Sequence, residues 1–232
     1  MAVAIVDTGL KAKTGTLGTT LTLASQTLTS GANVLVVWTH SFSSIAATGV
    51  TFNGSALTSL GSKTHDWFGS IITIQMWYVE NPTTGSAADI VATWGSSLRD
   101  RILTAASFSG YGSWGTVYTN SPSTNAKSAN PTVTIADWAS GDYALGGLID
   151  TYYDATEGGT LIAADHAAFN DDIGANSQYK TADGSLTWTM LSEQWATIGA
   201  RIIPAAATGQ PASRRMGGVM FAQNQSHGIK RW

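Results

Sequence analysis

The chain has 232 residues, a net charge of −3 and no cysteine, which excludes disulfides, thiolate metal sites and cysteine nucleophiles. Charged residues make up only 12% of the chain, about half of the usual share. The length is sufficient for a single β domain with a sizeable core.

Short apolar runs predict strands along the first half of the chain. These runs are Val3–Val6, Leu17–Leu28, Asn33–Ser41, Val50–Phe52, Ala56–Leu60, Ile71–Val79 and Ala88–Trp94. Asn53-Gly54 predicts a type I′ hairpin, because both central residues of that turn need positive φ. Ile71–Val79 is apolar on both faces, which predicts a strand deep in a sheet. Thr73 and Gln75 interrupt one face, which we expect to be partly solvated or covered by a neighbouring layer.

The second half continues in the same way. Its predicted strands are Arg101–Phe108, Thr132–Ile135, Tyr143–Asp150, Leu161–Phe169, Gln178–Thr181, Leu186–Met190 and Gln194–Ile203. The alanines of Leu161–Phe169 also allow a helix, but its length favours a strand. The paired glycines Gly146-Gly147 predict a bulge or a close backbone approach, and Asp183-Gly184 predicts a second hairpin turn. The pattern as a whole predicts an all-β fold, an antiparallel β-sandwich of jelly-roll type.

The chain divides by charge into a body, residues 1–204, and a C-terminal arm, residues 205–232. The arm carries four basic residues and no acidic one, so the net charge is +4 for the arm and −7 for the body. Its candidate contact residues are Arg214, Arg215, Met216, Val219, Met220, Phe221, Arg231 and Trp232. We expect this arm to extend and bind a neighbouring subunit. The alternatives are a last strand packed on its own body, or disorder.

No pattern predicts a catalytic residue, a metal site or a cofactor. The glycines of Gly110–Gly115 match G-x-G-x-x-G, but no helix follows, so an aromatic loop is expected there instead of a phosphate site. The four histidines lack metal-ligand spacing, and no G-x-S-x-G motif is present. Two acidic groups have oxygen ligands suited to Ca²⁺: Asp150 with Asp154 and Glu157, and Asp171-Asp172. Neither has an EF-hand loop, and solvated acidic turns are the favoured interpretation.

Nine tryptophans exceed what a core of this size needs. Trp67, Trp114 and Trp138 lie in or beside predicted loops, where exposed aromatic rings suit sugar faces or protein partners. Burial in the core or anchoring of the loops is the alternative for each of them.

Several motifs resemble β-sandwich proteins encoded by tailed bacteriophages. They are Val50-Thr51-Phe52-Asn53-Gly54 with Ala56-Leu57-Thr58, Ile74–Val79 with Glu80-Asn81-Pro82 and Gly85, Ala105–Gly110, and Arg214-Arg215-Met216-Gly217-Gly218 with Phe221-Ala222. The resemblance implies a non-enzymatic virion structural protein, foremost a capsid decoration (cement) protein held by its arm. A tail- or fibre-associated module that binds carbohydrate or a receptor is the alternative.

The implied partners are other virion proteins, either the major capsid protein or tail proteins, and further copies of the chain. Neither nucleic acid nor membrane is an expected partner. Met1–Leu10 has no basic region and is interrupted by Asp7, so no signal peptide is expected. We therefore expect synthesis in the host cytoplasm, and the resemblance implies a final location in the virion.

Overall fold

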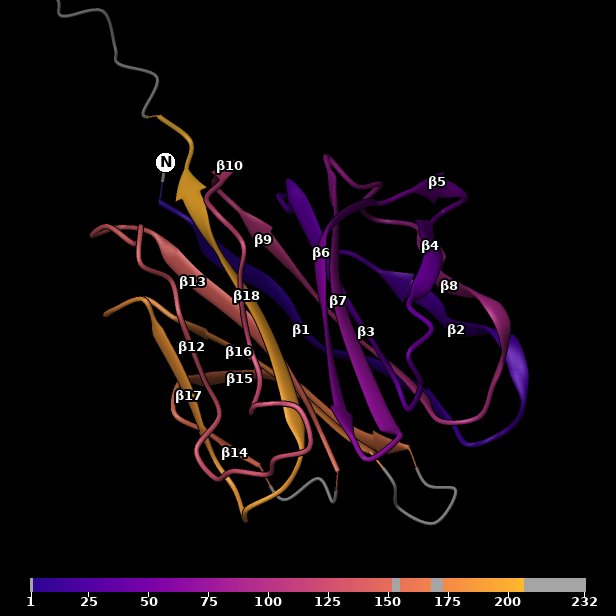
Figure 1. The fold of residues 1–232 in the computed structure, drawn as a ribbon. Helices are drawn as coiled ribbons and strands as arrows, with labels where there is room; N and C mark the ends of the chain where they lie inside the picture. The colour runs from indigo at the N-terminus through magenta and orange to yellow at the C-terminus, as the bar shows by residue number, and fades with distance from the viewer. Residues whose placement is uncertain (1, 152–154, 168–172, 207–232) are drawn as a thin grey trace, which may run out of the picture.

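The computed structural model describes residues 2–151, 155–167 and 173–206, and within these ranges all regular structure is β-strand. Four antiparallel sheets stack face to face (Figure 1). The predicted all-β antiparallel class is confirmed, whereas the jelly-roll connectivity stays a prediction. Within the described ranges, no helix is long and apolar enough to span a bilayer.

The central sheet has the strand order β1-β9-β3-β7-β6. Its strands are β1 (Ala4–Thr14), β9 (Arg101–Ser109), β3 (Val34–Ser41), β7 (Ser70–Glu80) and β6 (Thr58–Trp67). Every residue of β3 is buried, because layers cover both faces of this sheet. Continuous burial of this kind explains why the β3 and β7 sequences are apolar on both parities.

A smaller outer sheet covers one face of the central sheet in the order β2-β8-β4-β5. Its strands are β2 (Gly18–Thr27), β8 (Ala87–Leu98), β4 (Ala47–Phe52) and β5 (Ser55–Ala56). Thr73 and Gln75 of β7 face this sheet and are buried, at 2% and 6% exposure. The Gln75 Oε1 atom accepts the Ala47 N–H at 2.6 Å. Of the two environments expected for that face of β7, the structure shows the covered one.

The other face of the central sheet packs on a sheet of order β10-β18-β13-β16-β15, with β11 also paired to β18. The strands are β10 (Tyr111–Trp114), β11 (Tyr118–Asn120), β18 (Trp195–Pro204), β13 (Tyr143–Asp150), β16 (Ile173–Lys180) and β15 (Thr160–Ala167). The alanine-rich run is thus a strand over its described residues. A three-stranded sheet of β12 (Thr132–Thr134), β17 (Ser185–Thr189) and β14 (Thr156–Glu157) covers the outer face.

Gly146 and Gly147 of β13 point to opposite faces, and a facing tryptophan approaches each of them. A Cβ atom at Gly147 would lie 2.6 Å from Trp38, and one at Gly146 would lie 3.4 Å from Trp188 and 2.6 Å from Leu186. The pairing of β13 with its neighbours runs through both positions without a register shift. The close approach is therefore the observed role of this pair, and no bulge is present.

Gly110–Gly115 forms the corner at which the chain passes from the central sheet into β10. A Cβ at Gly110 would lie 2.1 Å from the Ala2 carbonyl oxygen, and one at Gly112 would lie 2.7 Å from the Ala205 backbone. The predicted aromatic loop is wrong, since Tyr111–Trp114 is a strand. At each of the three glycines a Cβ atom would collide with a neighbouring segment, at Ala2, Ala205 or Arg201. This close packing accounts for the glycine spacing without a phosphate site.

The two predicted hairpin turns have different outcomes. Asn53 and Gly54 have φ of 50° and 75° and join the paired strands β4 and β5, which confirms the type I′ hairpin. The prediction for Asp183-Gly184 is wrong, because β16 and β17 do not pair and lie in different sheets. A Cβ at Gly184 would lie 2.4 Å from the Ile135 carbonyl oxygen, so this glycine serves a crossover packed on the β12 segment.

Candidate binding surface at the loop end

The stack has two unlike ends. At one end, here called the terminus end, the described chain begins and stops: Ala4 pairs with Ser109, and the Ala205 N–H donates to the Gly110 carbonyl oxygen at 2.8 Å. The opposite end, here called the loop end, carries the connections at residues 15–17, 68–69, 99–100 and 190–194 (Figure 1). A bond of 2.9 Å from Gln194 Nε2 to Ser70 Oγ joins two of the sheets there.

Exposed large hydrophobic residues concentrate at the loop end. Four such residues occur in the described part of the chain, and three of them lie on loop-end connections: Leu17, Phe68 and Leu191, with 64%, 76% and 71% exposure. The fourth, Leu161, lies in strand β15 and is 42% exposed. Single exposed apolar residues are ordinary, but a group at one end of a molecule indicates an interaction surface.

Phe68 occupies a backbone conformation that disfavours bulky residues. Phe68 and Gly69 have φ of 50° and 87° and form the two-residue turn between β6 and β7. The other non-glycine residues with positive φ in the described ranges are one serine and four asparagines. A phenylalanine in this region costs on the order of 1 kcal/mol. Phe68 therefore exposes its aromatic ring to solvent while its backbone has a conformation that phenylalanine disfavours.

Side chains and backbone from neighbouring segments hold the Phe68 turn in place. The Phe68 N–H donates to Asn125 Oδ1 at 2.8 Å, and the Gly69 N–H donates to Asp66 Oδ1 at 2.8 Å. The Asn125 N–H in turn donates to the Asp66 carbonyl oxygen at 2.9 Å. The hairpin and the loop at residues 121–130 are thus locked together.

Trp67 packs against the Phe68 ring and so stabilises the same turn. Its ring meets the Phe68 ring edge to face at 5.7 Å, and Lys127 Nζ lies 4.4 Å from its ring centre, a cation–π contact. Lys127 also forms an ion pair of 2.6 Å with Glu193. These contacts connect the Phe68 turn to the segment that carries Leu191.

A buried arginine anchors the Leu17 connection. Arg101 is 1% exposed, and its guanidinium donates to the carbonyl oxygens of Thr20 at 2.7 Å and Thr16 at 2.9 Å. It also lies 5.4 Å from the Trp94 ring centre. Because these carbonyls flank Leu17, Arg101 fixes the backbone on both sides of that exposed side chain.

The three tryptophans proposed for glycan binding do not form one surface. Trp114 packs on Tyr78 at the edge of the core between the two large sheets, and Trp138 is partly buried against the separate core on the opposite face of β18. Tyr78 and Ser70, the residue paired with Trp67, are eight residues apart in β7, or about 26 Å. Of the three, Trp67 alone contacts the exposed loop-end residues. The proposed arm residues, 214–216, 219–221, 231 and 232, lie outside the described ranges.

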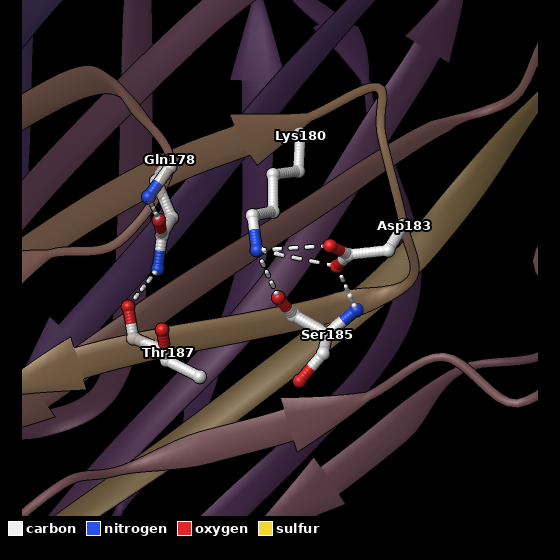
Figure 2. Close-up of polar contacts among 6 residues, drawn as sticks. Gln178, Lys180, Asp183, Ser185 and Thr187 are labelled. Atoms are coloured by element: carbon white, nitrogen blue, oxygen red, sulfur yellow. Dashed lines mark hydrogen bonds and ion pairs between the residues drawn. The ribbon is translucent and has the colours of Figure 1, made fainter.

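The other polar clusters of the described chain connect layers. Figure 2 shows Gln178 and Lys180 of β16 reaching β17: Gln178 Nε2 donates to the Thr187 carbonyl oxygen at 2.8 Å, and Lys180 Nζ donates to that of Ser185 at 3.1 Å. Lys180 also binds Asp183 at 3.2 Å (Figure 2). These bonds satisfy polar groups between the sheets and hold the three-stranded layer in place.

Arg201 forms a second such cluster with Asp142 at 2.6 Å and Asp137 at 3.1 Å. Burial opposes ionisation of Asp137, but the Thr116 N–H and Arg201 outweigh it and hold its pKa below the ordinary value. Among the described residues, no three histidine, aspartate or glutamate side chains gather as metal ligands. A shallow hollow of about 420 Å³ lies beside Asn53 and Asp89 on the outer sheet.

Sequence reasoning missed Phe68, because the predicted strands left residues 61–70 unassigned. The available signal was the pair Phe68-Gly69 between two runs with strand alternation. A glycine at this position is typical of a two-residue hairpin turn, but the residue before it is usually asparagine, aspartate or glycine and not phenylalanine. No protein-family model, no curated protein and no solved structure matches this chain. The function is therefore inferred from the residues and their placement.

Proposed function

We propose that the chain is a non-enzymatic virion structural protein, foremost a capsid decoration protein that joins the particle through residues 205–232. The jelly-roll type of sandwich with an extended C-terminal arm is part of this proposal, as are the major capsid or tail proteins and further copies as partners. The motif resemblance to phage sandwich proteins supports the setting. The apolar and basic composition of the arm supports its role in contact.

The observation that carries the proposal is the opposition of the two ends. The arm begins at the terminus end, where Gly112 packs directly under Ala205, while three of the four exposed large apolar side chains of the described residues lie at the loop end. A module attached at the terminus end would present its loop end to a second partner. Each contact adds about 25 cal/mol per Å² of apolar surface buried, and two weak contacts on one particle reinforce each other.

Quantitative mass spectrometry of purified particles tests this function. Hundreds of copies per particle indicate a capsid location, and a few to a few dozen indicate a tail or fibre. A protein missing from the particles contradicts the proposal. A chain truncated after Ala206 should remain folded, because the bond from Ala205 to Gly110 is kept, and should no longer join particles. Normal incorporation of the truncated chain would defeat the role of the arm.

The second candidate is a tail- or fibre-associated module that binds a receptor or carbohydrate. The aromatic pair Trp67 and Phe68 at the loop end favours it, because the pair is clamped in place and Phe68 is exposed. Ligand binding close to Trp67 should change tryptophan fluorescence, and Trp67→Ala should remove that change. The matched variant Trp114→Phe, at the distant terminus end, should keep it.

A further inference from the structure

A cluster of three aromatic residues and one acidic residue lies at the terminus end, beside the start of the arm. The Tyr111 hydroxyl donates to Glu80 Oε1 at 2.8 Å. Trp114 packs on Tyr111 and on Tyr78, with ring centres 5.6 Å and 5.5 Å apart. Tyr78 and Trp114 are partly buried, and Glu80 is exposed. These four residues, here called the Glu80 cluster, bring a carboxylate and aromatic rings together at the surface.

The Glu80 cluster has the chemistry of a cation site. At the loop end, Lys127 lies over the Trp67 ring and pairs with Glu193. Glu80 instead accepts a bond from a neutral hydroxyl, and no lysine or arginine in the described part of the chain is paired with it. Arginine suits such a place, because its guanidinium group binds carboxylates in a planar fork and stacks on aromatic rings.

The arm has two arginines within reach of this cluster. Tyr111 of β10 pairs with Pro204, the last residue of β18 (Figure 1). Arg214 and Arg215 follow Pro204 by ten and eleven residues. Ten residues extend up to about 33 Å, whereas one strand spacing of about 5 Å and one tyrosine side chain separate Pro204 from Glu80. Both arginines therefore reach Glu80 without any change in the body.

Tethering favours the chain's own arm over the arm of a second copy. A segment joined to its binding surface by a short linker meets that surface at an effective concentration of the order of millimolar. This exceeds the concentration of a second copy in dilute solution. The charges favour docking on the body, since the arm carries +4 and the body −7. In a free copy, the occupant of the Glu80 cluster is therefore the arm of the same chain.

We propose that Arg214 and Arg215 dock the arm of a free copy on its own Glu80 cluster, with a guanidinium group paired to Glu80 and stacked on Trp114. The docked arm is withheld from other copies until a particle offers a stronger contact, so the docking is autoinhibitory. This inference rests on the proposed role of the arm in assembly.

The experiment measures paramagnetic broadening by NMR in the full-length chain. The protein has no cysteine, so Ser213→Cys provides a single attachment point for a spin label beside the two arginines. The label should broaden the indole N–H signal of Trp114, which Trp114→Phe assigns by its disappearance. A mixture of spin-labelled, unenriched chain with unlabelled, ¹⁵N-enriched chain should show no broadening. Broadening in that mixture would place the arm on a second copy and overturn the inference.

Variants on both sides of the contact test its chemistry. Glu80→Gln keeps an acceptor for the Tyr111 hydroxyl but removes the charge, and should lower the broadening about threefold or more. Joint replacement Arg214→Gln and Arg215→Gln changes no residue of the body and should have the same effect. The matched control Asp89→Asn removes an exposed charge on the outer sheet and should leave the broadening unchanged. Equal broadening in wild type and Glu80→Gln, or none in wild type, would overturn the inference.

Competition during assembly separates this inference from the proposed function. When equal amounts of wild type and Glu80→Gln compete for particles, the variant should be incorporated more often, because its arm is released more readily. Equal incorporation of the two, or less of the variant, would overturn the inhibitory role of the docking. A chain missing from the particles contradicts instead the proposed function on which the inference rests.

Discussion

Two hairpins at opposite ends of the molecule share one backbone geometry but not one chemistry. The turn at the terminus end is Asn53-Gly54, with φ of 50° and 75°, and the turn at the loop end is Phe68-Gly69, with φ of 50° and 87°. Asparagine suits the first position of a type I′ turn, and phenylalanine does not. The Phe68 turn is held by Asn125 and Asp66. The difference teaches that a turn can retain an unfavourable residue where neighbouring segments hold it, and that such a residue points to function.

The largest effect is expected from Arg101, which anchors the Leu17 connection at the loop end. Arg101→Ala should lower the free energy of unfolding by about 3 kcal/mol or more, because it removes a large buried side chain together with both of its bonds to the carbonyl oxygens of Thr16 and Thr20. Chemical denaturation measures this loss. Arg101→Lys should recover only part of it, because an ammonium group cannot reproduce the planar fork of the guanidinium. A loss below about 0.5 kcal/mol for both variants would show that the loop end does not depend on this residue.

Acid should weaken the core beneath the loop end through His40. Full burial lowers the pKa of His40 to about 3 from 6.5, so its contribution to stability is complete above pH 6.5 and is lost as the pH falls toward 3. Between pH 6.5 and 4.5 this loss is about 2–3 kcal/mol. His65, whose pKa is also lowered by burial, acts in the same direction. Comparison of wild type and His40→Gln by denaturation at both pH values isolates the His40 share, and equal pH dependence would refute it.

A phenylalanine placed in the Asn53-Gly54 turn should destabilise the protein. Asn53→Phe should lower the free energy of unfolding by about 1–2 kcal/mol, because phenylalanine is strained at φ of 50° and cannot replace the bond from the Asn53 side chain to Thr83. Asn53→Gly is the matched control and should be nearly neutral, since glycine accepts positive φ. Thermal unfolding of the three proteins measures both effects. An Asn53→Phe variant as stable as wild type would remove the contrast between the two turns.

Loss of the bond from the Phe68 N–H to Asn125 should have a smaller effect on stability, and its size should depend on the residue at position 68. Asn125→Ala should cost about 1 kcal/mol in the wild type, because the Phe68 N–H loses its acceptor. In the Phe68→Asn background the cost should be about 0.5 kcal/mol smaller, since an Asn-Gly turn is stable by itself. A double-mutant cycle measures this coupling, and a coupling of zero would separate the clamp from the identity of residue 68.

Residue patterns predicted much of the architecture, and the reasons are local. Alternation and β-branched residues identified β3, β7, β9 and β13, and Asn53-Gly54 carried its own turn signal. The arrangement into four layers was not predictable in this way, because a strand that is apolar on both faces does not say which sheets cover it. The Asp183-Gly184 turn failed for the same reason: its sequence suits a hairpin, but β17 pairs with β12 and β14.

The candidate site was less predictable than the fold. Phe68 was hidden because its turn breaks the rule by which turns are recognised, and its support comes from Asn125, a residue 57 positions away. Trp67, Trp114 and Trp138 were selected for lying near loops, a property that does not distinguish a ring at the surface from one at a core edge. Only the tertiary contacts separate Trp67 from the other two.

The free energy of unfolding of Phe68→Asn, measured by urea denaturation beside the wild type, tests most directly whether the fold retains Phe68 against its own stability. The account predicts an increase of about 1 kcal/mol from the relief of backbone strain. A decrease would show that the phenylalanine ring stabilises the fold and would contradict the account.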